Sequence, residues 1–290
     1  MLIRLSKEQM EALFLQYLED IFKHPEIMSA AVRDTVITRE TVTETGKQAF
    51  NAGFHDIYSD IDLSVKVRLS KTGIAAPEDY MKRIDRFGVS KDTALGWMFV
   101  PNNRMYRIIF KNGMRYDFGF DFEYGEEDSF VLEPYVGEED NINWPLDNID
   151  RFWFIQVQAL GKLYRKDYLI SSHLANMNCN DTLVMQMILR DLEYRTNHHR
   201  YGHSEELEYT KDLGKNPFQT KDKTFNRIAD QLYAAALSYD RLTKMFYPEH
   251  MDRSDAYFSI WDWYESYRIS CENKYQEERQ RLKSTWGECH

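Results

Sequence analysis

The sequence has few cysteines and no long hydrophobic run. Its three cysteines, Cys179, Cys271 and Cys289, are far apart and odd in number, so they predict neither a disulfide framework nor a zinc site. No window approaches the roughly 18 consecutive apolar residues that a membrane span requires. The first residues, MLIRLSKEQMEALF, contain no apolar run followed by a small-residue cleavage site, so we expect no secretory signal. These absences predict a cytoplasmic protein without a membrane partner.

Basic residues are also scarce relative to acidic ones. The chain of 290 residues has 37 lysines and arginines against 47 aspartates and glutamates, which gives a formal net charge of −10. A general nucleic-acid binder needs a basic footprint, so we expect no nucleic-acid partner. An acidic surface suits a cationic small substrate, and it equally serves solubility. Hydrophobic residues make up 43% of the chain, which predicts a well-filled core rather than disorder.

The first half of the chain mixes helix and strand patterns. Ser6 precedes residues 9–22, whose apolar side chains recur at helical spacing. Residues 35–46 are rich in valine and threonine and predict a strand. Residues 61–69, IDLSVKVRL, alternate between apolar and polar side chains, as in a half-buried strand. A short helix is expected over residues 76–88, with a proline near its start.

Two further strands are predicted on either side of Asn112-Gly113. Residues 104–111 and 114–123 both have strand-like composition, and this dipeptide favours a two-residue type I′ turn. In the second strand the aromatic residues at even positions form one face, and Asp117 lies in the middle of the other. The two segments therefore predict a β-hairpin.

Strand patterns fade after about residue 147, and helical spacing dominates. Prolines and acidic residues between Glu133 and Asp150 mark the junction. Helical patterns cover residues 148–164, 181–199, 222–246 and the stretch from 254. We therefore predict an α+β fold, with a mixed domain at residues 1–147 and a helical domain at residues 148–290. A small basic cluster, Lys162, Arg165 and Lys166, could approach phosphates or form a solvated helix end.

Three aspartates are the strongest candidates for chemistry. Asp60 and Asp62 stand at i and i+2 of one predicted strand, so they project from the same face, roughly 6–7 Å apart. If the strand that carries Asp117 lies beside this one, three carboxylates meet. Such a cluster binds divalent magnesium, which two-metal phosphoryl and nucleotidyl transfer requires. The alternative is a solvated strand face with incidental acids.

The order of these motifs resembles a known family. Gly46 lies fourteen residues before the Asp60-Ile61-Asp62 motif, and NGMRYDFGF follows downstream. This arrangement resembles the bacterial aminoglycoside 6-adenylyltransferases (streptomycin adenylyltransferase type), within the polymerase-β-like nucleotidyltransferase superfamily. The resemblance continues through residues 148–169 and 183–194, and so extends from about residue 8 to about residue 200.

The resemblance implies a fold, a reaction and roles for particular residues. It implies a nucleotidyltransferase-type mixed sheet with flanking helices, an all-helical C-terminal domain, and an active site between them. ATP would bind with Mg²⁺ on Asp60 and Asp62, and a hydroxyl of a small aminoglycoside-like acceptor would attack its α-phosphate. Asp117 matches the third carboxylate, which ligates metal or accepts the hydroxyl proton. Glu193 is the candidate for binding a cationic acceptor.

The chain departs from the family at the turn that holds the triphosphate. Gly46-Lys47-Gln48 stands where the family carries Gly-Ser-Arg, and that turn opens a helix whose amides bind phosphate. The glycine would still permit close backbone approach, and Lys47 would supply a point charge. The prediction is therefore a Mg²⁺-dependent nucleotidyltransferase with Gly46, Lys47 and Gln48 at the nucleotide. The alternative is a degenerate relative that binds or senses nucleotide without transfer.

Overall fold

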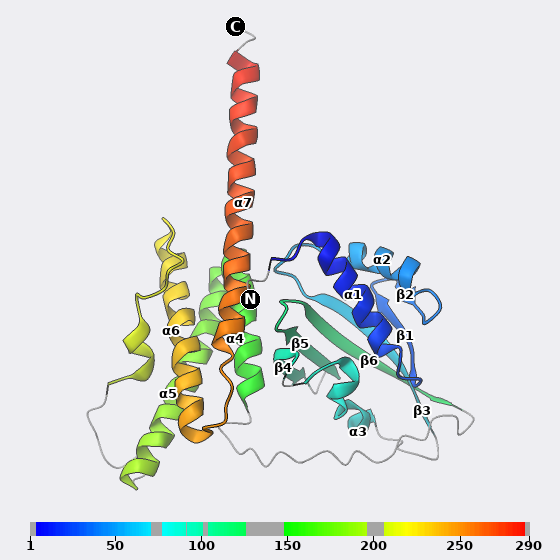
Figure 1. The fold of residues 1–290 in the computed structure, drawn as a ribbon, viewed down its shortest axis with the longest axis horizontal. Coiled ribbons are helices and arrows are strands. Elements are labelled where there is room, and N and C mark those ends of the chain that lie inside the picture. The colour runs from blue at the N-terminus through cyan, green and yellow to red at the C-terminus, as the bar shows by residue number, and fades with distance from the viewer. Residues whose placement is uncertain are drawn as a thin grey trace.

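The computed structural model describes residues 4–70, 77–90, 92–100, 104–125, 148–195 and 206–287. A six-stranded mixed sheet with helices against it occupies the N-terminal half, and helices make up the C-terminal half (Figure 1). The predicted α+β class and the helical C-terminal region are therefore confirmed.

The sheet has the strand order β2-β1-β3-β6-β5-β4. Its strands are β1 (Ile27–Val32), β2 (Thr35–Ile37), β3 (Ile61–Ser70), β4 (Ala94–Val100), β5 (Met105–Phe110) and β6 (Arg115–Gly125). Only the central β3–β6 pair is parallel, and all other neighbours are antiparallel. The parallel pair therefore brings two strands from distant parts of the sequence together in the middle of the sheet.

One face of the sheet is covered by α1 (Lys7–Ile21), as its apolar spacing predicts. Ser6 begins this helix with a capping box, in which its hydroxyl accepts from the Gln9 amide and the Gln9 side chain accepts from the Ser6 amide. Tyr17 stacks on Tyr116 of β6, with ring centroids 4.5 Å apart. The aromatic face of β6 is thus buried under α1, and its polar face is left for the site.

The strand predicted over residues 35–46 is wrong for most of its length. Only Thr35–Ile37 is a strand, and Val42–Gly53 forms the helix α2. The buried side of α2 includes Val42, Gly46 and Ala49, which recur every three or four residues. Packing of this helical stripe against α1 and the sheet outweighs the weak strand preference of threonine and valine. The strand β1 was not predicted.

The predicted hairpin around Asn112-Gly113 is confirmed, but its turn type is wrong. β5 and β6 pair antiparallel, with Ile109 opposite Arg115. Gly113 has a φ of 89°, whereas a type I′ turn requires positive φ at both central residues. Asn112 instead accepts a hydrogen bond from the Met114 amide through its side-chain oxygen. The wider loop shifts the register of the hairpin by one residue.

The helix predicted over residues 76–88 is divided into two short pieces. These are α3 (Pro77–Met81) and the 3₁₀ helix η1 (Ile84–Phe87). Gly88 ends the second piece with a φ of 69°, a left-handed conformation that glycine adopts without strain.

The predicted helices of the second half are confirmed over the described residues, and residues 196–199 of the helix predicted over 181–199 lie outside them. They are α4 (Ile149–Tyr164), α5 (Tyr168–Tyr194), α6 (Lys223–Phe246) and α7 (Ser254–Gly287), with the 3₁₀ helix η4 (Glu208–Asp212) before α6. Asp222 caps α6 by accepting from the Thr224 and Phe225 amides. α5 begins earlier than the pattern predicted, because Asp167 caps it at Ile170.

Helix α4 joins the two halves by packing directly on β4. A Cβ atom at Gly96 would lie 2.4 Å from the Asp150 carbonyl oxygen and 2.6 Å from the Phe154 nitrogen. Arg253 stabilises this packing of α4 on β4, because it donates to the Leu95 carbonyl of β4 at 2.8 Å and pairs with Asp150 of α4 at 2.5 Å. The glycine thus lets the helix backbone approach the strand closely.

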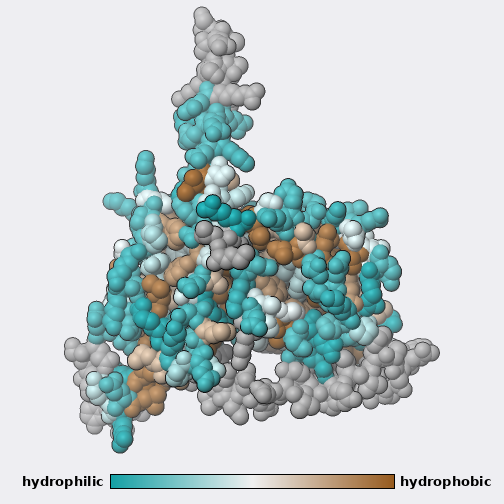
Figure 2. All heavy atoms as spheres, in the orientation of Figure 1, coloured by the Kyte–Doolittle hydropathy of each residue, from teal (hydrophilic) through white to brown (hydrophobic). Residues whose placement is uncertain are grey.

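Helix α7 extends beyond the rest of the molecule (Figure 1). Its first part is buried at Tyr257, Trp261 and Tyr264, whereas residues 271–280 are all exposed. The coloured part of this projection in Figure 2, below its grey tip, is mostly hydrophilic on the face shown. Among the helices that the structure describes, none combines the length and apolar character needed to cross a membrane.

Candidate functional site

The three predicted carboxylates lie side by side on the polar face of the sheet. Asp60 immediately precedes β3 and Asp62 is its second residue, so both project from one face. The parallel pairing of β3 with β6 sets Asp117 directly beside Asp62. One cavity is lined by all three side chains. The strand that carries Asp117 therefore does lie beside the Asp60-Asp62 strand, which is the condition for the three carboxylates to meet.

Two arginines neutralise part of this acidic cluster. Arg107 of β5 is the register partner of Asp117, and its guanidinium lies 2.7 Å from Asp117 Oδ2 and 3.1 Å from Asp60 Oδ2. Arg115 of β6 lies 3.7 Å from Asp60 Oδ2 and donates to the Tyr58 carbonyl at 3.1 Å. Arg107 therefore bridges two of the three carboxylates.

One carboxylate oxygen in this cluster lacks a partner. Asp117 is only 6% exposed, and its Oδ1 atom is buried without a hydrogen bond to any of the described residues. Since Arg107 contacts only Oδ2, Oδ1 is free to accept from a water molecule, to carry a proton or to bind a cation. The orphaned oxygen is the feature that a hard divalent ion fits.

The acid–base properties of the three aspartates differ. Burial, together with the charge of Asp60, raises the pKa of Asp117 to about 6, which the Arg107 hydrogen bond only partly opposes. Burial and Asp60 also raise the pKa of Asp62. For Asp60, burial opposes ionisation, but Arg115, its own backbone amide and Arg107 hold its pKa below the usual value. The neighbouring arginines therefore outweigh the effect of burial on the pKa only at Asp60.

Two cavities flank the aspartates. The first, of about 260 Å³, has four basic side chains in its wall, namely Arg107, Arg115, Lys162 and Arg165. The second, of about 350 Å³, shares Asp60, Asp62 and Arg165 with the first and is also lined by His55 and Asp56. The Asp60-Asp62 pair thus lies between the two cavities, and both basic and acidic side chains surround it.

The loop before Asp60 is held by the helical half. The Tyr58 ring packs edge-on against Tyr264 of α7, with centroids 4.8 Å apart, and stacks on Tyr164 of α4 at 5.7 Å. Arg165, just after α4, makes a two-pronged contact with Asp56 at 2.6 Å and 3.2 Å. The position of Asp60 therefore depends on contacts with both α4 and α7.

The predicted nucleotide residues Gly46, Lys47 and Gln48 are not at this site. They lie inside α2 rather than in a turn before a helix, and they line neither cavity beside the aspartates. A Cβ atom at Gly46 would lie 2.6 Å from the Leu15 side chain of α1. The glycine is therefore explained by close helix packing, and the phosphate-turn interpretation is wrong.

Glu193 is likewise absent from the cavities beside the aspartates. It is an exposed residue in the last turn of α5, and a 27-residue helix is about 40 Å long. The end of α5 that follows Arg165 is the opposite one, beginning at Tyr168. The predicted role of Glu193 in acceptor binding is therefore not supported by its position.

Two functional candidates, Arg107 and Arg115, were missed from the sequence. The alternation of β6 could have found Arg115, because it shares a face with Asp117. Arg107 depends on the hairpin register, which the sequence did not fix. Lys162 and Arg165 of the predicted basic cluster do line the cavity, whereas Lys166 does not.

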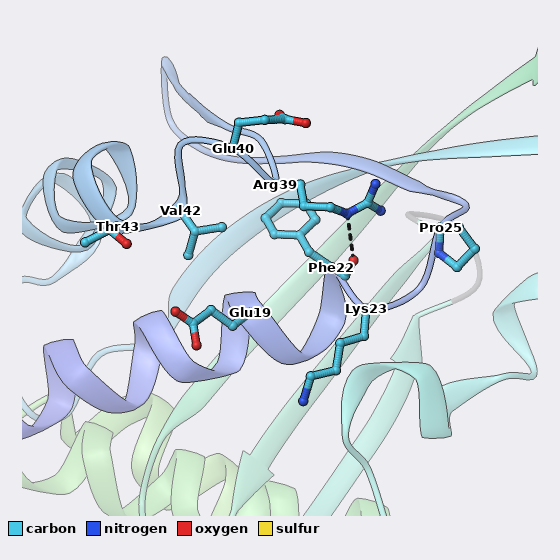
Figure 3. A pocket seen from close by; sticks show the side chains of 8 residues that line it. All are labelled: Glu19, Phe22, Lys23, Pro25, Arg39, Glu40, Val42 and Thr43. Atoms are coloured by element: carbon cyan, nitrogen blue, oxygen red, sulfur yellow. Dashed lines mark hydrogen bonds between the residues drawn. The ribbon is translucent and has the colours of Figure 1, made fainter.

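Two other features of the molecule have structural explanations. A cavity of about 510 Å³ lies between α1 and α2, where Arg39 donates to the Phe22 carbonyl at 2.8 Å and holds the end of α1 (Figure 3).

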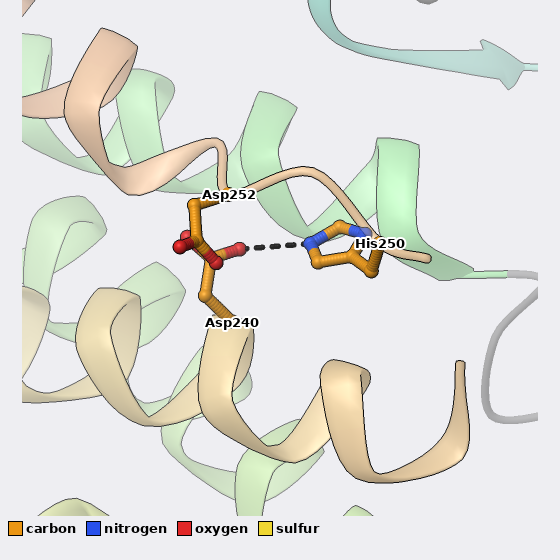
Figure 4. A group of neighbouring side chains, drawn as sticks. All are labelled: Asp240, His250 and Asp252. Carbon is orange, nitrogen blue, oxygen red and sulfur yellow. Dashed lines mark hydrogen bonds and ion pairs between the residues drawn. The ribbon is translucent and has the colours of Figure 1, made fainter. Parts of the chain in front are cut away.

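Asp240, His250 and Asp252 form a cluster with ligand-type atoms within 4.8 Å of one another (Figure 4). Its carboxylates are already engaged.

The Asp240 cluster serves the start of α7. Asp240 accepts from His250 at 3.0 Å and from the Arg253 and Ser254 amides at 3.0 Å and 2.8 Å. Asp252 pairs with Lys244 at 2.5 Å. Asp240 therefore satisfies amides at the beginning of the helix.

The site near β3 and β6 combines three carboxylates with four basic side chains in one small cavity. Such a set can bind a divalent cation through oxygen ligands and polyphosphate through guanidinium and ammonium groups. No protein-family model matches the chain, and none of the curated proteins matches its sequence. The assignment of function therefore depends on the chemistry of these residues.

Proposed function

We propose that the chain is a Mg²⁺-dependent nucleotidyltransferase that moves AMP from ATP to a hydroxyl of a small, aminoglycoside-like molecule. The observation that carries the proposal is the convergence of Asp60, Asp62 and Asp117 in one cavity, with the Asp117 Oδ1 atom buried and unpaired among the described residues. The central β3–β6 pair and the helical half beside it support a nucleotidyltransferase-type fold.

The three aspartates would hold magnesium, and the basic wall would hold phosphates. Bound Mg²⁺ would polarise phosphoryl oxygens and favour the ionised form of an attacking hydroxyl. Arg115, Lys162 and Arg165 line the same cavity and would neutralise the charge of the triphosphate. Side chains would thus bind the phosphates in place of the family's glycine turn.

A second candidate is a nucleotide-binding module without transfer activity. Two observations favour it: Arg107 occupies oxygens of both Asp60 and Asp117, and α2 supplies no phosphate turn. In this alternative the same cavity would bind nucleotide, but no acceptor would react.

Calorimetry followed by a product assay separates the two candidates. ATP is titrated into the protein with Mg²⁺ and with a chelator, and pyrophosphate release is then measured against a panel of hydroxyl-bearing acceptors that includes aminoglycosides. The transferase predicts Mg²⁺-dependent binding and pyrophosphate release with at least one acceptor. Binding without release on any acceptor supports the binding module, and absence of binding contradicts both.

Metal binding should weaken in acid because Asp117 must lose its proton. Its pKa lies at about 6 in the folded protein, so the ionised form that binds metal prevails above this pH and is lost below it. We expect Mn²⁺ affinity to be about tenfold weaker at pH 5 than at pH 7. Mn²⁺ is titrated without nucleotide, whose phosphates also ionise in this range. An affinity that stays constant from pH 5 to pH 7 contradicts the role of Asp117.

A further inference from the structure

Arg107 is paired with two of the three carboxylates that would hold a divalent cation. Its Nε and Nη2 atoms both lie 2.7 Å from Asp117 Oδ2, and Nη2 also lies 3.1 Å from Asp60 Oδ2. The guanidinium therefore supplies the positive charge that two of the three proposed metal ligands need. The side chain is 20% exposed, so water screens this pair only in part.

A metal ion and Arg107 compete for the negative charge of the same two carboxylates, Asp60 and Asp117. A divalent cation on Asp117 Oδ1, the oxygen that Arg107 does not contact, would still repel the guanidinium held on Oδ2 of the same carboxylate. Metal binding to Asp60 and Asp117 therefore requires Arg107 to loosen its contacts with Oδ2. Without nucleotide, metal binding is therefore weakened by the free energy needed to separate Arg107 from Asp60 and Asp117.

Phosphate offers Arg107 a replacement for the carboxylates. Arg107 lines the same cavity as Lys162 and Arg165. Its guanidinium carbon lies 5.2 Å from the centroid of the Phe154 ring of α4. A polyphosphate in this cavity would bring the negative charge that Arg107 loses when metal takes its carboxylates. With metal and nucleotide bound together, Arg107 would thus still have an anionic partner. With metal alone it would lose the carboxylates without a replacement.

We propose that Arg107 is a displaceable counter-ion that makes metal binding depend on nucleotide, a role which rests on the metal site of the proposed function. In the structure Arg107 pairs with both Asp60 and Asp117. With nucleotide and metal bound, Asp60 and Asp117 would hold the metal and Arg107 would pair with the phosphates. The two ligands therefore bind with positive coupling, which is reciprocal by thermodynamic necessity.

The test measures Mn²⁺ binding by the loss of the free-ion electron paramagnetic resonance signal. Wild type is titrated alone and with a non-hydrolysable ATP analogue, after correction for Mn²⁺ held by the analogue in solution. We expect the analogue to tighten Mn²⁺ binding by about tenfold or more. Absence of tightening in the wild type overturns the proposal without reference to any variant.

Variants of Arg107 then identify the counter-ion. Arg107→Met keeps much of the aliphatic length and removes the charge, so it should bind Mn²⁺ alone about tenfold more tightly than wild type and show weaker coupling. Arg107→Lys keeps the charge and should retain the weak binding of the wild type. Arg68→Met is the matched control, because Arg68 pairs with Glu123 across the same two strands that carry Asp62 and Asp117 and lines neither cavity.

The outcomes distinguish this proposal from the proposed function. Equal Mn²⁺ affinity of wild type and Arg107→Met, without nucleotide, overturns the counter-ion role and leaves the metal site intact. Failure of every protein to bind Mn²⁺, with or without the analogue, contradicts the metal site and with it the transferase.

Discussion

Asp62→Ala is expected to abolish nucleotidyl transfer while leaving the fold intact. Asp62 is exposed, and its register partner Asp117 would remain as a ligand without its neighbour. A metal ion contributes several kcal/mol to such transition states, and a loss of about 4 kcal/mol corresponds to about a thousandfold in rate. Turnover is measured as pyrophosphate release with saturating ATP, Mg²⁺ and acceptor.

The matched control for Asp62→Ala is Asp121→Ala. Asp121 is an exposed carboxylate on β6, and it lines neither cavity. Its removal changes the net charge equally and should leave turnover unchanged. Full turnover by Asp62→Ala, with the thermal midpoint of wild type, would show that the metal ligands are misassigned.

Gly96→Ala is expected to lower the stability of the protein substantially, although it adds only one methyl group. The new Cβ atom would lie 2.4 Å from the Asp150 carbonyl oxygen and 2.9 Å from Trp153 Cβ, so α4 must move away from β4. Overpacking against backbone costs about 2–3 kcal/mol, which lowers the thermal midpoint by about 5–10 °C. Thermal unfolding followed by circular dichroism measures the change.

Gly119→Ala provides the comparison for Gly96→Ala. Gly119 lies in β6, and a methyl group added there would have no heavy atom of the described residues within 4 Å. Its substitution should therefore shift the midpoint by less than about 1 °C. If the two variants melt together, the close approach of α4 to the sheet is not what holds these elements in place.

Residues with a strong local pattern were predicted correctly. The alternation of β3 sets Ile61, Leu63 and Val65 in the core and Asp62 outside it, because a strand with one buried face has only two ways to turn its side chains. The apolar spacing over residues 222–246 likewise predicted α6, which begins at Lys223. The aspartates were found because they belong to such patterns.

The arginines of the site depend on register, which local pattern does not determine. A two-residue turn at Asn112-Gly113 would set Arg107 opposite Phe118, on the apolar face of the sheet. The observed loop sets it opposite Asp117 instead. One residue of loop length thus decides whether the carboxylates have a counter-ion.

Helix α2 was mispredicted because two signals conflicted. Thr43 and Thr45 are β-branched and favour strands, yet both sit on a helix whose buried stripe contains Phe50. Burial of that stripe stabilises the helix only when α1 and the sheet cover it. Tertiary packing of this kind is not visible in a single segment, so the phosphate turn placed there was also wrong.

The Tyr58–Tyr264 contact has a consequence for biosynthesis. The Tyr58 hydroxyl donates to the Tyr264 carbonyl across 206 residues of sequence, so this one of the contacts that hold the loop before Asp60 forms only after most of the chain has been made. At about 5–20 residues per second, the intervening stretch takes about 10–40 s to synthesise. The aspartates therefore leave the ribosome well before α7 does, and the Tyr58–Tyr264 contact can form only once α7 has been synthesised.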